Sequence, residues 1–429
     1  MTVTVVGLGK IGLPLAVQYA MKGEQVFGVD INQKTVDCVN EGVEPFPEEE
    51  NLKEFLSDVV SAGKLKASTT TSECVSKSDV VVVVVPLFVD ESAEPDFTAL
   101  DSATTEIARG LEKGTLIAYE TTLPIGTTRN RFTKAIEEIT GFKVGEDFYV
   151  VFSPERVLTG RVFDDLKKYP KILGGVTENC AVKGAVFYER VLEFDERSDL
   201  EKPNGVWVLK SSEAAEFVKL AETTYRDVNI ALANQFALFA ETIGVDIYQV
   251  IQSANSQPYS KIHKPGMAVG GHCIPVYPKF YLLNDPKADI VANSRQLNES
   301  MPGRMAKEVF RYFGDQKQLR ILILGLSYRS GVKETYNSGC IAVAKELRDK
   351  GATVEVFDRL FTKQEIESLG FKYFSGKPAS IDCIVIQNEE PTNQSFLEDF
   401  DLTQIPIFDG RNSLTSNKLN VVYSLGKPQ

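Results

Sequence analysis

Histidine, tryptophan and methionine are scarce in this 429-residue chain, which has 2, 1 and 5 of them. The two histidines, His263 and His272, are too few for the three protein ligands that a catalytic zinc ion usually has, so we predict no metal site. The longest purely apolar run, residues 80–89, is too short to span a bilayer. The chain opens directly into a strand-like run, without the pattern of a signal peptide.

The charged residues and cysteines narrow the class of protein further. Lys and Arg number 47 and Asp and Glu number 59, which gives a net charge of −12 and disfavours binding to nucleic acid or to an anionic membrane. The six cysteines are widely spread and form no CxxC pair, so reduced thiols and a cytoplasmic protein are expected. At about 150 residues per domain, the length predicts two or three domains.

The first third carries the pattern of a dinucleotide-binding fold. Residues 2–6 are typical of a buried strand and lead into Gly7-Leu8-Gly9-Lys10-Ile11-Gly12, a GxGxxG motif. A helix is expected at 13–21, and a second strand, 25–29, ends at Asp30. In such folds the pyrophosphate meets the helix N-terminus and the acid binds the ribose hydroxyls. Because Asp30 would repel a 2′-phosphate, the sequence predicts NAD rather than NADP.

Further strands are expected at residues 79–85, 115–120, 148–152 and 172–176. Ligands of parallel sheets gather beyond the carboxyl ends of the strands. Pro86, Thr121, Thr122 and Glu155 follow such ends and are therefore candidates to face a ligand. Helix capping is an alternative role for them, and it does not exclude ligand binding.

Residues 212–240 predict one long helix, because apolar residues recur along them at helical spacing. Lys219 lies inside this apolar set. Such a lysine usually reaches solvent, but if it is buried it must find negative charge and becomes a candidate electrostatic stabiliser. A long helix between two α/β domains is a common place for dimer contacts, so we predict a homodimer.

The stretch Gly270-Gly271-His272-Cys273-Ile274-Pro275 is the main candidate for covalent chemistry. Two glycines let a ligand approach the backbone closely, and a thiol follows. A buried structural cysteine is the alternative, because free cysteine is among the most buried residue types. The preceding loop contains Lys261, His263 and Lys264, a small basic cluster that we interpret as phosphate-binding; a solvated charged loop is the alternative.

The last third repeats the alternation of strands and helices. Strands are expected at 320–326, 353–357, 383–386 and 405–408, and a helix at 341–347. The last strand leads to Asp409-Gly410-Arg411-Asn412, and no second GxGxxG occurs. The sequence thus predicts an α/β protein with two doubly wound Rossmann-like domains joined by a long central helix and a helical middle domain.

Taken in order, these parts resemble the UDP-glucose/GDP-mannose dehydrogenase family over nearly the whole chain. The motifs that carry the resemblance are Gly7 to Gly12 with Asp30, residues 121–128, Ser153-Pro154-Glu155-Arg156, Lys219, Gly270 to Pro275, and residues 409–412. Residues 154–158, 225–231 and 271–275 look like the N-acetylhexosamine branch of the family, and UDP-N-acetylmannosamine is the favoured substrate.

The resemblance implies NAD-dependent, four-electron oxidation of a nucleotide sugar at C6 to the uronic acid, as in polysaccharide biosynthesis. It implies an NAD-binding domain at 1–200, a central helical and dimerisation domain at 205–305, and a nucleotide-sugar (UDP)-binding domain at 315–429. The implied catalytic residues are Cys273 as nucleophile, Lys219, Glu155 and Thr122. The implied cofactor-binding residues are Gly7, Gly9, Lys10, Ile11, Gly12, Asp30, Pro86, Thr121 and Thr122, and the substrate-binding residues are Glu155, Arg156, Lys219, Lys261, His263, Gly270, Lys333 and Arg411.

The sequence departs from the family pattern in four places. Thr223 and Tyr277 stand where Asn and Asp are usual, which leaves the general base open. Tyr259 or Ser260 replaces an Arg that is offered to the neighbouring subunit, and Glu334-Thr335-Tyr336 replaces an Asp-x-Arg that binds the nucleotide. Because Cys273, Lys219 and Glu155 are retained, we interpret these changes as a reshaped pocket.

Three alternatives stay open. The chain could be a UDP-N-acetylglucosamine or UDP-glucose 6-dehydrogenase. It could be a two-electron dehydrogenase of the 3-hydroxyacid type, although residues 320–412 argue against this because those enzymes have no second doubly wound domain. It could also be a non-catalytic nucleotide-sugar-binding protein, which the changes at Thr223 and Tyr277 motivate.

Overall fold

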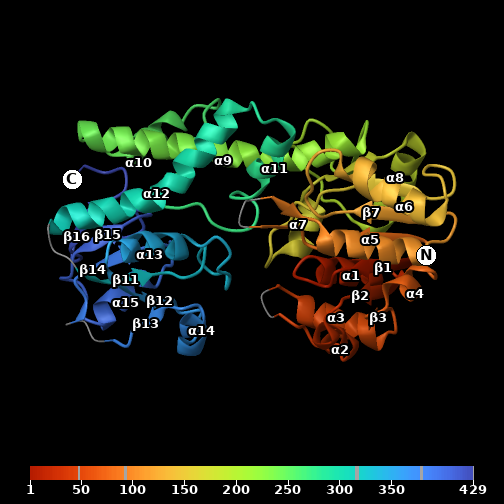
Figure 1. The fold of residues 1–429 in the computed structure, drawn as a ribbon, viewed down its shortest axis with the longest axis horizontal. Helices are drawn as coiled ribbons and strands as arrows, with labels where there is room; N and C mark the ends of the chain where they lie inside the picture. Colours follow the sequence, from red (N-terminus) through yellow and green to blue (C-terminus); the bar gives the residue numbers. More distant parts are fainter. Residues whose placement is uncertain (47–48, 91–93, 315–317, 377–379, 429) are drawn as a thin grey trace. The chain divides into compact units, whose positions relative to one another are not determined.

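The computed structural model describes residues 1–46, 49–90, 94–314, 318–376 and 380–428. The chain forms two compact units, Met1–Ala221 and Glu222–Gln429, and each is described by itself (Figure 1). The predicted fold class is confirmed, because each unit is built on a largely or wholly parallel sheet and long helices occupy the middle of the chain. The division into three domains stays a prediction, and residues 315–317, where the third begins, lie outside the described residues.

The first unit is built on an eight-stranded sheet with the order β10-β9-β8-β7-β4-β1-β2-β3. Its strands are β1 (Thr2–Val6), β2 (Gln25–Val29), β3 (Leu65–Ser68), β4 (Val80–Val83), β7 (Leu116–Tyr119), β8 (Tyr149–Phe152), β9 (Lys171–Gly175) and β10 (Val206–Leu209). Side chains of the central strands are fully buried, because helices cover the sheet and a parallel strand buried on both faces needs a continuous apolar run. The strand order reverses between β1 and β4, which is where doubly wound folds bind dinucleotides.

Two groups of helices pack around this sheet (Figure 1): α1 contacts α3 and α7, while α4, α5 and α6 form a second group and α8 packs on β8 to β10. The helices are α1 (Gly12–Met21), α2 (Gln33–Asn40), α3 (Leu52–Ser61), α4 (Thr71–Val75), α5 (Thr98–Gly110), the π-helix η1 (Thr128–Thr133), α6 (Lys134–Thr140), α7 (Val162–Lys168) and α8 (Glu178–Val191). A short hairpin pairs β5 (Phe88–Val89) with β6 (Pro95–Asp96).

One strand of the first sheet runs against its neighbour. β9 pairs antiparallel with β8, whereas β7 and β8 are parallel. The first residue of β9, Lys171, therefore lies at the same edge of the sheet as the carboxyl ends of β7 and β8. This edge carries the residues that follow Tyr119 and Phe152, among them Glu120 and Glu155.

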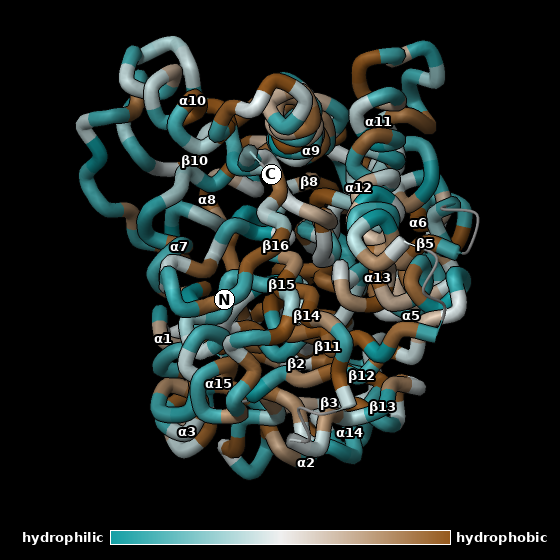
Figure 2. The backbone as a smooth tube through the Cα atoms, turned by 90° about the vertical axis from the view of Figure 1, so that its left-hand side faces the viewer, coloured by the Kyte–Doolittle hydropathy of each residue, from teal (hydrophilic) through white to brown (hydrophobic). Residues whose placement is uncertain are grey.

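The second unit has a six-stranded parallel sheet in the order β13-β12-β11-β14-β15-β16. Its strands are β11 (Arg320–Leu324), β12 (Thr353–Phe357), β13 (Lys372–Tyr373), β14 (Cys383–Ile386), β15 (Ile407–Asp409) and β16 (Val421–Ser424). Figure 2 shows β11 and β14 as largely hydrophobic segments, in keeping with the burial of residues 321–324 and 383–386. Its helices are α10 (Ile247–Ala254), α11 (Tyr277–Asn284), α12 (Asp289–Phe313), α13 (Gly339–Asp349), α14 (Lys363–Ser368) and α15 (Asn393–Asp399).

The long helix predicted at 212–240 is confirmed as α9 (Ser212–Ile243), which crosses from the first unit into the second. Most other predicted elements agree within about two residues, as expected where apolar residues continue past a strand end. The strand expected at 79–85 ends at Val83, for example, because Val84 and Val85 leave the ladder and lead to Pro86. Within the described ranges, no helix is long and apolar enough to cross a membrane.

Candidate active site

The glycine motif forms a tight turn between β1 and α1. Gly7 has a φ of +97°, and a Cβ built on Gly12 would lie 1.8 Å from the carbonyl oxygen of Gly7. A Cβ on Gly9, in contrast, meets no atom within 4 Å. Gly7 and Gly12 therefore serve the packing of strand on helix, while the exposed Gly9 leaves an open backbone surface. Lys10 and Ile11 complete the turn ahead of α1.

Asp30 lies beside this turn, at the end of β2. Its Oδ2 accepts a hydrogen bond from the Leu8 amide at 2.9 Å, and its Oδ1 accepts one from the Asn32 amide at 2.8 Å. The carboxylate is thus fixed next to the open surface of Gly9. An open glycine backbone, a helix N-terminus and a fixed acid together fit the pyrophosphate and ribose of NAD.

The segment after β7 holds Thr121 and Thr122. Thr121 Oγ1 donates to the carbonyl oxygen of Val85 at 2.6 Å, which joins this segment to the one that carries Pro86, and Thr122 is buried. Glu216 on α9 is a residue of this region that the motifs did not point to. Its carboxylate accepts from Thr128 N at 2.8 Å and from Thr128 Oγ1 at 2.6 Å. Burial raises the pKa of Glu216 to about 7 in spite of these hydrogen bonds.

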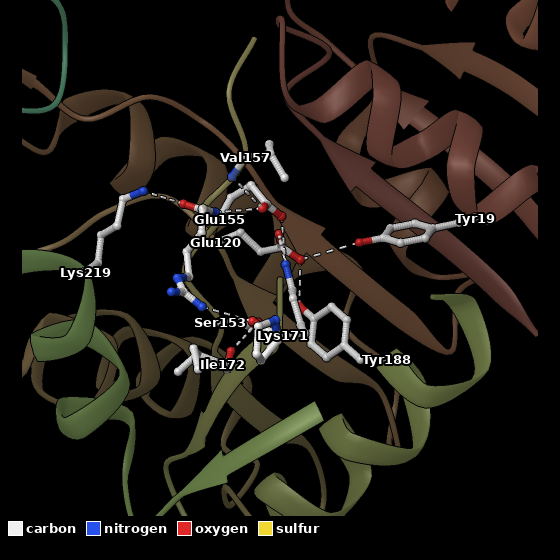
Figure 3. A network of polar contacts seen from close by, with 11 residues as sticks. Tyr19, Glu120, Ser153, Glu155, Val157, Lys171, Ile172, Tyr188 and Lys219 are labelled. Carbon is white, nitrogen blue, oxygen red and sulfur yellow. Dashed lines mark hydrogen bonds and ion pairs between the residues drawn. The ribbon is translucent and has the colours of Figure 1, made fainter. Parts of the chain in front are cut away.

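Glu155 and Lys219, predicted separately, are brought together in the first unit (Figure 3). Lys219 is only 7% exposed, and its Nζ donates to the backbone carbonyl of Glu155 at 2.6 Å. The buried option for Lys219 is therefore the correct one. Arg156 turns to the start of β9, where its Nη1 donates to the Pro170 carbonyl at 3.1 Å.

Sequence reasoning missed Lys171, which pairs with Glu155, and Glu120, which pairs with Lys171 in turn. Lys171 Nζ lies 2.8 Å from Glu155 Oε2 and 2.8 Å from Glu120 Oε2 (Figure 3). A signal was present, since Lys171 is a charged residue directly before the apolar run 172–176 and Glu120 closes another predicted strand. What the sequence could not supply was the antiparallel direction of β9, which brings the two together.

The electrostatics of this group separate the two carboxyls. Burial raises the pKa of Glu120 to about 7, although Lys171 opposes the shift. Burial acts on Glu155 too, but Lys171, the Arg156 amide and Lys219 outweigh it and lower the pKa of that carboxyl. Burial works against the charge of Lys171, yet the two carboxylates raise the pKa of its ammonium. Near neutral pH Glu155 is thus an anion, and Glu120 is the group that exchanges a proton.

In the second unit, Cys273 follows a turn that has no room for side chains. A Cβ on Gly270 would lie 2.8 Å from the Asn337 carbonyl oxygen, and Gly271 N donates to the Tyr336 carbonyl at 3.0 Å. Cys273 is a partly exposed free thiol just ahead of α11, so it is not the buried structural cysteine of the alternative interpretation. The adjacent His272 contacts the Glu334 carboxylate and stacks on the Tyr336 ring, with centroids 4.0 Å apart.

Lys261 and His263 line a pocket of about 290 Å³ together with neighbours from residues 255–262. Asn229 on α9 shapes this loop, because its Nδ2 donates to the Lys261 carbonyl at 2.9 Å and its Oδ1 accepts from His263 N at 2.9 Å. Burial, aided by Arg226, lowers the pKa of His263, so the imidazole is neutral at physiological pH and the lysines supply the charge of this loop.

The remaining two predicted substrate residues lie at the second sheet. Lys333 Nζ lies 2.6 Å from Glu365 Oε1. Arg411 Nε donates to the Gln387 carbonyl at 2.7 Å, beyond the ends of β14 and β15. Asp358, at the end of β12, accepts from Leu326 N at 2.8 Å and Ser327 N at 2.9 Å, so the second sheet repeats the acid-on-turn arrangement of Asp30 without a GxGxxG.

Three segments of the chain match successive domains of one family. Residues 1–192 match the NAD binding domain of the UDP-glucose/GDP-mannose dehydrogenase family, residues 213–300 its central domain, and residues 322–416 its UDP binding domain. The chain belongs to this family. It is a nucleotide-sugar dehydrogenase, and the predictions of the family, of an NAD-dependent enzyme and of NAD as cofactor are confirmed.

Individual family members match most or all of the chain. The chain is 35% identical to a UDP-N-acetyl-D-mannosamine dehydrogenase of Pyrococcus horikoshii, over 99% of this chain and 98% of that protein. It is 34% identical to the protein of that name in Escherichia coli K12, over 80% and 82%. Its fold matches the structure of the P. horikoshii UDP-D-ManNAc dehydrogenase with a TM-score of 0.86 at 32% identity, covering 100% and 99% of the two chains.

The four departures from the family pattern occupy defined places. Thr223 is fully buried on α9, and Tyr277 is the first residue of α11. Tyr259 is 95% exposed. Glu334 and Tyr336 both contact His272, the residue before Cys273, so the residues that replace the usual Asp-x-Arg lie against the loop of the candidate nucleophile.

Proposed function

We propose that this family member oxidises UDP-N-acetylmannosamine at C6 to the uronic acid, through a thioester on Cys273. The observation that carries the proposal is the 35% identity, over 99% of this chain, to a protein named UDP-N-acetyl-D-mannosamine dehydrogenase. UDP-N-acetylglucosamine and UDP-glucose are the next candidates as substrate. The partly exposed thiol after a glycine turn supports the covalent route.

Cys273 divides the oxidation into two parts. Bound NAD accepts one hydride from C6 in each of two successive oxidations. Between them, the Cys273 thiolate adds to C6 of the aldehyde and forms a hemithioacetal, whose oxidation leaves a thioester. Water then adds to C6, the C–S bond breaks, and the thiol and the carboxylate are released. One alcohol, one water and two NAD⁺ give one carboxylate, two NADH and three protons.

The first unit supplies the charge and the proton acceptors in this proposal. The buried ammonium of Lys219 stabilises the negative oxygens that develop at C6. Glu155, ionised at neutral pH, and Thr122 hold or activate the water. NAD is bound by the turn of Gly7, Gly9, Lys10, Ile11 and Gly12 and by Asp30. The cofactor is bordered by Pro86 and Thr121.

The substrate contacts follow the same logic. We propose that Lys261 and His263 bind phosphate at their pocket and that Arg156, Lys333 and Arg411 contribute polar contacts. Gly270 stays a predicted substrate residue, but a Cβ there would meet the Asn337 carbonyl oxygen, so any contact with the sugar is made by its backbone. Since Lys333 already pairs with Glu365, its contribution requires a change of partner. These assignments are tested by single alanine variants, which should raise KM more than they lower kcat.

We further propose a cytoplasmic homodimer. Support comes from α9, where Leu232, Phe236, Phe239 and Ile243 are 44%, 37%, 60% and 54% exposed at spacings that place them on one helix face. Light scattering behind size exclusion measures the assembly, and a monomeric parent protein would count against the dimer.

The test of function is the number of NADH molecules formed per sugar consumed, measured with UDP-N-acetylmannosamine, UDP-N-acetylglucosamine, UDP-glucose and GDP-mannose. Two NADH per sugar with UDP-N-acetylmannosamine preferred is the expected result. One NADH per sugar would exclude the thioester route. Binding without NADH would favour a non-catalytic nucleotide-sugar-binding protein, which Thr223 and Tyr277 motivate.

A further inference from the structure

The ion cluster of Glu120, Lys171 and Glu155 is more elaborate than the proposed chemistry requires (Figure 3). The Lys171 side chain is 5% exposed, and those of Glu120 and Glu155 are 0% and 11% exposed. A buried ion pair adds little net stability, because the cost of removing both charges from water offsets their attraction. A cluster that contains a residue of the proposed mechanism is therefore a candidate for a role in the reaction.

Both oxygens of the Glu155 carboxylate are held. Oε1 accepts from the amides of Arg156 at 2.7 Å and Val157 at 3.2 Å, and Oε2 receives Lys171 Nζ at 2.8 Å. The two amides fix one edge of the carboxylate through the local backbone. Lys171 fixes the other edge from a different strand, so it determines the direction in which the carboxylate points.

Lys171 is itself anchored from the far side. Glu120 Oε2 holds Nζ at 2.8 Å, while Glu120 Oε1 accepts from Tyr188 OH at 2.6 Å and from Tyr19 OH at 3.4 Å. The Tyr188 ring also lies 4.9 Å from Nζ. Side chains from α1 and α8 thus hold Glu120, and Glu120 holds Lys171 on the side away from Glu155.

We propose that Lys171, anchored by Glu120, is a positioning residue of the reaction: it orients the Glu155 carboxylate and holds it as an anion. The inference rests on the proposed function, in which Glu155 handles the water that releases the product. Glu120 regulates this hold. While Glu120 is protonated, Lys171 forms an ion pair with Glu155 alone. Once Glu120 is ionised, Lys171 pairs with both carboxylates, and its attraction for Glu155 is weaker.

The decisive variant is the double substitution K171M/E120Q. In the parent, with Glu120 ionised, the ammonium of Lys171 and the two carboxylates give the cluster a net charge of −1. The double variant keeps only the Glu155 carboxylate, so the net charge is again −1, but the hydrogen bond from Lys171 to Glu155 is lost. The controls are K171R, which keeps a cation between the two carboxylates, and E155Q, which removes the positioned group itself. Folding of each variant is checked by circular dichroism and melting temperature.

We expect K171M/E120Q to lower kcat for UDP-N-acetylmannosamine about 100-fold with KM within about twofold, as E155Q does, since a positioned acid or base contributes roughly 10²–10⁴-fold. Because water attack becomes the slow step, the substrate adduct on Cys273 should accumulate and appear in the mass of the quenched protein. K171R should restore at least a tenth of the parent kcat. Adding K171M/E120Q to E155Q should lower kcat no further than E155Q does alone.

Different results separate the inference from the function on which it rests. The positioning role alone is overturned if K171M/E120Q folds and keeps the parent kcat. It is also overturned if the decreases in kcat caused by K171M/E120Q and by E155Q multiply when the variants are combined. An E155Q protein with full turnover overturns the role of Glu155 and the inference with it. A parent protein that forms no NADH with any of the four sugars overturns the proposed function.

A second measurement serves if the double variant does not fold. E120Q alone keeps the shape of the cluster but cannot titrate, and the groups that face position 120 are Lys171, Glu155, Tyr19 and Tyr188. The parent should show a fall in kcat as pH rises through about 7, and E120Q should lack it. Because Glu216 also has a pKa of about 7, the comparison is made in proteins that carry Glu216→Gln, and a fall that persists unchanged in E120Q there overturns the inference.

Discussion

Two glycines of the GxGxxG motif, Gly9 and Gly12, make opposite predictions for the same substitution. In Gly12→Ala the new Cβ would lie 1.8 Å from the carbonyl oxygen of Gly7. That neighbour is backbone, so it cannot rotate away, and the start of α1 must shift from β1. Overpacking usually costs about 1–3 kcal/mol, and we expect at least the upper end of that range here.

In Gly9→Ala the new methyl group meets nothing within 4 Å, and φ is not positive at this position. The free energy of unfolding should therefore change by less than about 0.5 kcal/mol. The methyl group does occupy the surface that we assign to the NAD pyrophosphate. We expect the affinity for NAD to fall at least tenfold, which corresponds to about 1.4 kcal/mol.

Urea unfolding gives the stability of each variant, and calorimetric titration with NAD gives its affinity, so each protein serves as the control for the other. Gly12→Ala should be unstable, and Gly9→Ala should be stable but poor at binding NAD. A Gly9→Ala protein with the parent affinity would refute the close approach of the cofactor to this turn. A Gly12→Ala protein with the parent stability would refute the packing argument.

Three further predictions concern the acids and the thiol. Asp30→Asn should narrow the preference for NAD over NADP, and an unchanged ratio of kcat/KM for the two cofactors would exclude the ribose role. The carboxyl of Glu216 has a pKa of about 7 in the folded protein, against an ordinary value of 4.5. Its contribution to stability is therefore largest below about pH 4.5 and is lost as pH rises to about 7. At about 1.4 kcal/mol per pKa unit, this loss is about 3 kcal/mol. In Glu216→Gln the urea midpoint of unfolding should therefore depend less on pH between about pH 4.5 and 7 than it does in the parent. An equal dependence on pH in the two proteins would contradict this. Cys273→Ala should fold normally and lose NADH turnover with nucleotide sugars, whereas normal turnover would point to a two-electron enzyme.

The elements that could be predicted from the sequence are those in which local chemistry and burial agree. In helix α10, for example, apolar spacing begins directly after Asp246, whose side chain caps the helix by accepting from Tyr248 N. The strands β1, β2, β12 and β14 were predicted residue for residue, since residues that favour strands, such as Val, Ile, Thr and Phe, dominate them.

The helix α12 shows where such reasoning stops. It runs for 25 residues with Pro302 inside it and with Arg295 and Asn298 buried on its inner face. Both polar side chains bond Asp227 on α9, Arg295 Nη1 at 2.7 Å and Asn298 Nδ2 at 2.8 Å. The apolar spacing is broken at the positions that pack against α9, and only the tertiary structure supplies the partners that make burial of these groups affordable.

The candidate site divides in the same way. Sequence motifs pointed to Asp30, Glu155, Lys219 and Cys273, because their residue types are chemically distinctive where they stand. Lys171 was missed, because its importance depends on the direction of one strand. A pattern of apolar residues fixes which residues form a strand but not which way it runs in the sheet.

The antiparallel run of β9 also limits how this protein can be altered. A residue inserted between β8 and β9 is absorbed by the loop only if the pairing of Phe152 with Gly174 is kept. A slip of one residue would turn Lys171 to the opposite face of the sheet. It would also move Leu173 into the place of Gly174, where a Cβ lies 2.1 Å from the Ser211 carbonyl oxygen. When loops are exchanged between related enzymes, the length of this connection can therefore change. The pairing of Gly174 and Gly175 with β8, however, has to be kept.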